Sequence, residues 1–144
     1  MLQNLLFGSI LVALTVLIHT GGLILIARVT PPLARWFGFH NHDAGRTLVM
    51  TGTVLGILGV LTLEIWAWAL AYVWLGVAQV FSEALSLSTD MFSTIGYGAI
   101  PIAQDWHLIT ALEGINGFLM IGWSTAYLVA AGTRHGPFRR GDHF

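Results

Sequence analysis

Few side chains in this chain could do chemistry, and the most telling of them stand in apolar surroundings. The carboxyl groups of Glu64 and Glu113 and the imidazole of His19 fall inside long apolar runs. An ionisable group in a run that crosses a bilayer is a functional candidate by default. The structural alternative is a satisfied core residue; for Glu64, and in the same way for Glu113, this would be a neutral acid hydrogen-bonded to a short polar helix.

The composition places these residues in a membrane protein. Of the 144 residues, 56% are hydrophobic and 9% are charged, whereas a soluble domain has about 25% charged residues. Cysteine is absent, which excludes a disulfide framework and a thiolate metal site. No basic patch is interleaved with aromatic residues, so the sequence gives no support for binding to nucleic acid.

Three apolar runs are long enough to cross a bilayer, which takes about 20 helical residues. They are Leu5–Ile26, Thr47–Leu75 and His107–Ala131. The first lacks the basic start of a signal peptide, so we expect a retained helix. Proline has no amide donor and restricts the residue before it, so Pro31-Pro32 is predicted to end this helix.

The basic residues predict the orientation of the chain in the membrane. All six are arginines, in two clusters: Arg28, Arg35, Arg46, Arg134, Arg139 and Arg140. With three crossings, both clusters lie on one side, which the positive-inside rule assigns to the cytoplasm. We therefore expect a multi-pass protein of the cell membrane with its N-terminus outside and its C-terminus in the cytoplasm.

A fourth segment is too short and too polar to cross the bilayer. Residues Gln79–Phe92 fit a re-entrant half-helix, which a membrane tolerates only where protein or water covers it. The loop after it contains Thr94-Ile95-Gly96-Tyr97-Gly98. Gly96 and Gly98 permit backbone conformations that other residues rarely adopt.

This five-residue loop, following a half-helix and lying between two spans, resembles the selectivity filter of the potassium-channel superfamily. The resemblance is to the small prokaryotic pore-domain type, here with one extra N-terminal helix. It implies that the backbone carbonyls of Thr94, Ile95, Gly96, Tyr97 and Gly98 replace the water around K⁺. It also implies a homotetramer, because one loop supplies one wall of four. No enzyme activity and no cofactor other than the permeant ion are implied.

The expected fold class is therefore an all-α membrane protein. Its layout is an added N-terminal helix (1–30), a cytoplasmic loop (31–46), a pore domain (47–133) and a short tail (134–144). The pore domain is expected to contain an outer helix, a half-helix (79–92), a filter (94–98) and an inner helix (107–131).

Some residues depart from the pattern of the family. Ala99 stands where an acidic residue commonly follows the filter, so Asp90, expected to support the filter with Ser93, needs another partner such as Trp106 or a backbone amide. This leaves a weakly selective channel for monovalent cations as one alternative. A non-conducting structural subunit or haem anchor is another, although a haem anchor needs two intramembrane histidines and only His19 is embedded.

The third run contains candidates for gating. Gly117, and less so Gly114, is placed where the inner helix of such channels often bends, but small residues equally allow close helix packing. At helical spacing from Gly117, we expect Ile121, Ser124 and Leu128 to line the inner pore.

Overall fold

The computed structural model describes residues 2–36, 43–96 and 102–135, and its regular elements in these ranges are all helices. They are α1 (Leu2–Trp36), α2 (Asp43–Leu75), α3 (Phe81–Phe92), the short 3₁₀ helix η2 (Gln104–Trp106) and α4 (His107–His135). Three stretches are long and apolar enough to cross a membrane: Leu2–Pro32, Ala44–Leu75 and Gln104–Arg134. The prediction of three spanning helices is confirmed.

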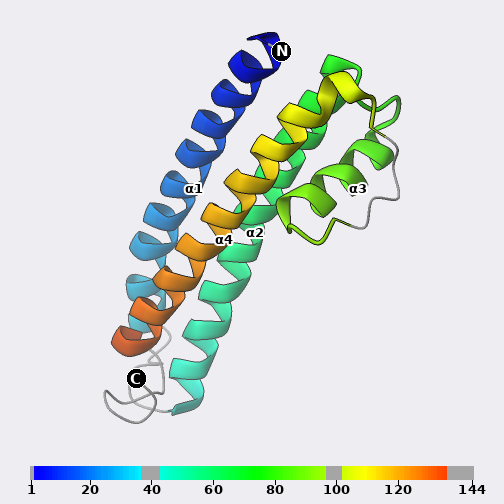
Figure 1. The fold of residues 1–144 in the computed structure, drawn as a ribbon. Coiled ribbons are helices and arrows are strands. Elements are labelled where there is room, and N and C mark those ends of the chain that lie inside the picture. The colour runs from blue at the N-terminus through cyan, green and yellow to red at the C-terminus, as the bar shows by residue number, and fades with distance from the viewer. Residues whose placement is uncertain (1, 37–42, 97–101, 136–144) are drawn as a thin grey trace.

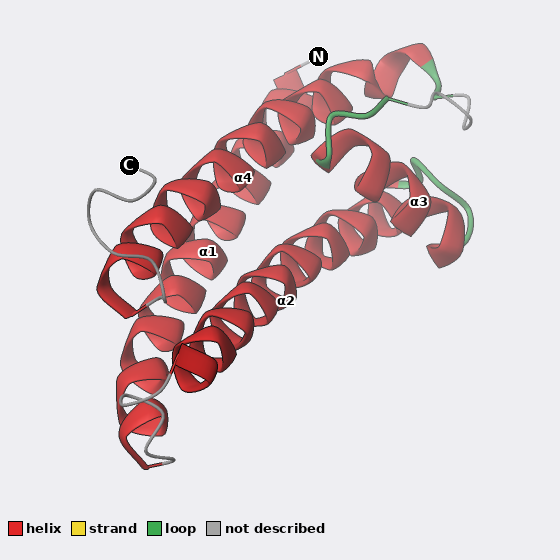
Figure 2. Cartoon of the chain, turned by 90° about the horizontal axis from the view of Figure 1, so that it is seen from below, coloured by secondary structure: helices red, strands yellow, loops and turns green. Residues whose placement is uncertain are grey.

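The three long helices lie lengthwise against one another, and α3 occupies one end of the bundle (Figure 1). The start of α1, the end of α2 and the start of α4 share that end. The end of α1 and the start of α2 lie at the opposite end, near the end of α4. Viewed from below, α3 packs beside α2 and away from α1 (Figure 2).

The prediction that Pro31-Pro32 ends the first helix is wrong. α1 continues to Trp36 and contains both prolines. The φ angle of proline is itself helical, so the backbone can keep its helical path although Pro31 and Pro32 leave the carbonyls of Ala27 and Arg28 without their usual amide donors. This part of α1 also faces α4, since Ala27, Thr30 and Pro31 share a cavity with residues of that helix. The connection is therefore shorter than predicted.

The hydrophobic core gathers around α3. Its buried members come from the last turns of α2, the connection to α3, α3 itself and the first half of α4: Trp68, Ala69, Tyr72, Ala78, Ala84, Leu87, Phe92, Ile109 and Met120. Lipid offers apolar surroundings as good as a core, so close packing contributes much of helix association in a membrane. The best-packed part of the bundle thus holds α3 in place.

α1 also approaches the other long helices closely. A Cβ atom added at Gly22 would lie 2.4 Å from Val60 Cγ2 on α2, and one added at Gly8 would lie 2.6 Å from Leu112 Cδ1 on α4. Phe7 meets Trp74 edge to face, with 5.7 Å between ring centroids. α1 is therefore an integral part of the helix bundle.

Candidate functional site

The short helix α3 is amphipathic, which explains how it is oriented. Its buried residues Ala84, Leu87, Ser88 and Phe92 are spaced three, four and eight positions from the first. This spacing forms one stripe on a helix, and the stripe faces α2 and α4. The opposite stripe, which includes Glu83 and Ser86, is exposed.

The backbone leaves α3 in an unusual conformation. The amides of Ser93 and Thr94 donate to Thr89 O (3.0 Å) and Met91 O (3.1 Å) and close the helix. Thr94 then has φ of 60° and Gly96 has φ of 65°, two left-handed residues separated by one. Glycine adopts this conformation freely, but for threonine it costs about 1–2 kcal/mol. Such strain in a side-chain-bearing residue is concentrated at functional sites.

Three of the five predicted filter residues can be located. Thr94, Ile95 and Gly96 are exposed on the single chain at the end of α3. Tyr97 and Gly98, together with Ala99, lie outside the described residues. The first part of the predicted filter therefore begins directly at the end of α3, which packs against α4.

Glu113 joins α2, α3 and α4 through one buried carboxyl group. Its side chain has no solvent exposure. The Tyr72 hydroxyl on α2 donates to Oε2, and the Ser88 hydroxyl on α3 lies 2.5 Å from Oε1. Ser88 Oγ is also 2.9 Å from Ile65 O. Since a serine hydroxyl has a single hydrogen, it can donate to only one of these two acceptors at a time.

Two glycines of α4 allow it to touch the end of α3. A Cβ atom added at Gly117 would lie 2.1 Å from Phe92 O and 2.7 Å from Phe92 Cα, both backbone atoms. At Gly114 the nearest atom, Met91 O, is 3.4 Å away. Gly117 therefore serves close packing, while α4 is continuous past both glycines. A bend at Gly117 or Gly114 stays a prediction.

The predicted filter supports make few contacts. Ser93 Oγ donates to Asp90 O at 3.3 Å, which closes the end of α3 locally. The Asp90 carboxyl is partly buried and has no hydrogen-bond partner among the described residues. A partnership with Trp106 is therefore not seen. Among these residues, no group of three or more histidine, aspartate or glutamate side chains could hold a metal ion.

The expected partner of Glu64 is wrong. Its carboxyl group is hydrogen-bonded to the His19 ring on α1, with 2.9 Å between Oε1 and Nδ1, and both side chains are fully buried. The helix α2 presents Glu64 to α1 and Tyr72 to α4, so the carboxyl that reaches the short helix is Glu113. The His19 ring also lies 5.3 Å from the Trp123 ring on α4, centroid to centroid.

Sequence reasoning missed a second buried polar contact. Asn116 on α4 donates from Nδ2 to Thr15 Oγ1 on α1 at 2.9 Å. Thr15 and His19 are four residues apart and share one helix face, which is the signal that could have identified a polar seam on α1. Ser124, expected to line the inner pore, is instead 4% exposed within the single chain. The rotation assumed for α4 at that position was therefore wrong.

A comparison with known families decides the class of protein. The family model described as "Ion channel" matches residues 58–134, more than half of the chain. The chain belongs to this ion channel family. No curated protein and no solved structure gives a match.

The region matched by the family model contains most of the buried polar residues described above. It takes in most of α2, all of α3, the loop that follows and nearly all of α4, whereas α1 lies outside it. An ion channel with three such helices is a multi-pass membrane protein that handles ions as an oligomer. Glu113, Ser88 and Gly117 lie inside the channel region, and His19 and Thr15 attach α1 to it.

Proposed function

We propose that this ion channel conducts K⁺ passively through a homotetrameric filter formed by residues 94–98. The observation that carries the proposal is the backbone after α3. Thr94 and Gly96 are both left-handed, with Ile95 between them. In such a stretch the peptide carbonyls are turned away from the directions of a regular helix or strand, as a row of ion ligands requires.

The exposure of this stretch supports assembly around an axis. Thr94, Ile95 and Gly96 are exposed on one chain although they follow the best-packed part of the bundle. A single loop can supply one side of an ion's coordination shell, and cyclic symmetry supplies the others. Burial of these residues would then come from three neighbouring subunits.

The short helix contributes a favourable field for a cation. Its C-terminal end, which carries partial negative charge, leads directly into Thr94. The last turn of α3 has no basic residue to offset that charge, and Asp90 lies within it. A cation close to this end of α3 is therefore stabilised.

Flux through liposomes tests the proposal. In protein reconstituted at equal density, we expect K⁺ flux in the wild type and its loss in Gly96→Ala, because alanine is strained at φ of 65°. Gly52→Ala is the matched control, since an added Cβ there has no neighbour within 4 Å in the described chain. Equal flux in the wild type and Gly96→Ala would overturn the proposed filter.

A weakly selective cation channel is the second candidate, favoured by one observation. Ala99 stands where an acidic residue commonly follows the filter, so Asp90 lacks that partner for bracing it. A filter braced less firmly distinguishes ions of different size less well. Nearly equal permeation of K⁺ and Na⁺ in the same liposomes would favour this candidate over strict potassium selectivity.

A further inference from the structure

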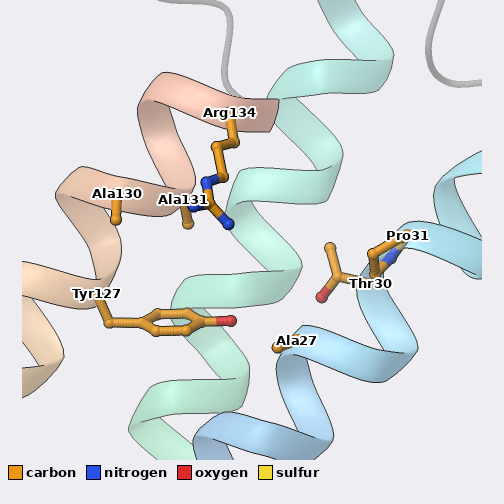
Figure 3. A pocket seen from close by; sticks show the side chains of 7 residues that line it. All are labelled: Ala27, Thr30, Pro31, Tyr127, Ala130, Ala131 and Arg134. Carbon is orange, nitrogen blue, oxygen red and sulfur yellow. The ribbon is translucent and has the colours of Figure 1, made fainter.

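A small cavity lies between α1 and α4, at the end of the bundle away from α3 (Figure 3). Its volume is about 230 Å³. The residues that line it are Ala27, Thr30, Pro31, Tyr127, Ala130, Ala131 and Arg134. None of these residues belongs to the polar contacts around α3.

Three polar groups are directed into this cavity from two helices. The Arg134 guanidinium extends back along α4, the Tyr127 hydroxyl points toward α1, and the Thr30 hydroxyl faces both (Figure 3). Thr30 Oγ1 donates its single hydrogen to Ile26 O at 2.7 Å, so Thr30 offers no donor to the cavity while that bond is formed. Among the described residues that line the cavity none is acidic, so none of them neutralises the positive charge of Arg134.

The rest of the lining is apolar and open to the surface, which favours a ligand with both a polar and an apolar part. Alanine and proline side chains form the remaining wall, and Ala27 and Ala130 are exposed, so the cavity opens to the surface of the bundle. A guanidinium group binds the oxygens of a phosphate in a bidentate manner. A cation and the Tyr127 hydroxyl beside an apolar wall suit a phosphate that carries an apolar group.

The position of the cavity indicates where such a phosphate would come from. The first and third apolar stretches end at Pro32 and Arg134, respectively. The cavity therefore lies at the membrane boundary, at the level of lipid headgroups. Basic pockets between membrane helices bind anionic headgroups at this level.

We propose that this cavity binds the phosphate of an anionic membrane lipid, with Arg134 as its charged ligand and Tyr127 as a hydrogen-bond donor. Bound lipid would bridge α1, which lies outside the channel region matched by the family, to α4 within it. The site is independent of ion conduction, so the failure of either proposal leaves the other standing.

Native mass spectrometry of the detergent-released assembly with added phosphatidylglycerol tests the site. We expect lipid adducts on the wild type and a decrease of about tenfold or more in apparent affinity in Arg134→Gln, since glutamine removes the charge-assisted hydrogen bonds to the phosphate. Tyr127→Phe should weaken binding less, and Arg134→Lys should restore part of it. Arg46→Gln is the matched control, because Arg46 is an exposed arginine on α2 that does not line the cavity.

The outcomes separate a built site from general attraction. Equal losses of lipid affinity in Arg134→Gln and Arg46→Gln would mean that the lipid is attracted by any exposed arginine. This result would overturn the proposed site. Inorganic phosphate tested in the same assay separates the two sources of the ligand. Displacement of lipid by millimolar inorganic phosphate would overturn the proposal that the ligand is a lipid, and would indicate a site for a soluble anion. Unchanged elution on size exclusion verifies that each variant is folded.

Discussion

At the scale of single residues, the carboxyl group of Glu113 has the densest set of partners. It accepts a hydrogen bond from the Tyr72 hydroxyl of α2 and lies beside the Ser88 hydroxyl of α3. All three side chains are buried. Glutamine preserves an acceptor for Tyr72 and adds a donor toward Ser88. Leucine removes the acceptor of the Tyr72 hydroxyl, whereas the Ser88 hydroxyl can still donate to the carbonyl oxygen of Ile65.

We therefore expect Glu113→Gln to be close to wild type in thermal stability and Glu113→Leu to lose about 1–3 kcal/mol, the cost of a buried hydroxyl without a partner. Thermal unfolding in detergent checks this difference. Tyr72→Phe with Glu113→Leu is the control, since removing both partners should recover part of the loss. Leucine as stable as glutamine would show that the carboxyl is not needed to hold α3.

At the scale of elements, α3 keeps its place because α4 comes close enough to touch its backbone. An alanine at Gly117 would place Cβ 2.1 Å from Phe92 O, and backbone atoms cannot move aside as a flexible side chain can. We expect Gly117→Ala to separate α3 from α4, to lower stability by about 1–3 kcal/mol and to reduce ion flux. Unfolding and flux measured on the same preparation check this prediction.

Two neighbouring glycines provide the comparison. Gly114→Ala should be milder, since its nearest atom is 3.4 Å away, and Gly122→Ala should be neutral, since no atom lies within 4 Å in the described chain. Wild-type stability in Gly117→Ala, with altered flux alone, would contradict the packing role and favour a hinge.

How far the sequence predicted these elements depends on the kind of information needed. Apolar runs of sufficient length predicted α1, α2 and α4, and the polar, short segment before Thr94 predicted a separate helix, observed as Phe81–Phe92. The rotation of each helix was not predictable from one chain. This is why Glu64 was assigned the partner that Glu113 has, and why Ser124 was placed on the pore side.

The prolines of α1 show a second limit. Pro31-Pro32 predicts a helix end from local chemistry alone, whereas α1 extends to Trp36. The packing of α1 against α4, whose residues are about a hundred positions away in sequence, outweighs the local preference. Neighbouring helices commonly stabilise prolines in membrane helices in this way.

At the scale of the whole molecule, two buried polar contacts attach α1 to the ion channel region. His19 pairs with Glu64, and Thr15 accepts from Asn116. Removal of one member of a buried pair leaves the other polar group buried without a partner. A single substitution therefore lowers the free energy of unfolding by more than the intact pair contributes to it. We expect His19→Leu and Glu64→Leu each to lower stability, and the double variant to lose less than the sum of the two.

A double-mutant cycle by thermal unfolding in detergent measures this coupling. Glu64→Gln is the conservative control and should keep both the hydrogen bond to His19 and most of the ion flux. Additive effects in the cycle would contradict a direct role for the pair, and loss of flux in a normally assembled Glu64→Gln protein would indicate a functional carboxyl.

The central claim concerns the loop after α3, and the reversal potential of the purified channel in a planar bilayer tests it most directly. With K⁺ at unequal concentrations on the two sides and Na⁺ making the total cation concentration equal, we expect the current to reverse near the equilibrium potential of K⁺. We expect no such current from Gly96→Ala, whose alanine cannot readily adopt φ of 65°. A wild-type current that reverses near zero would contradict selectivity for K⁺, and an identical current from Gly96→Ala would contradict conduction through residues 94–98.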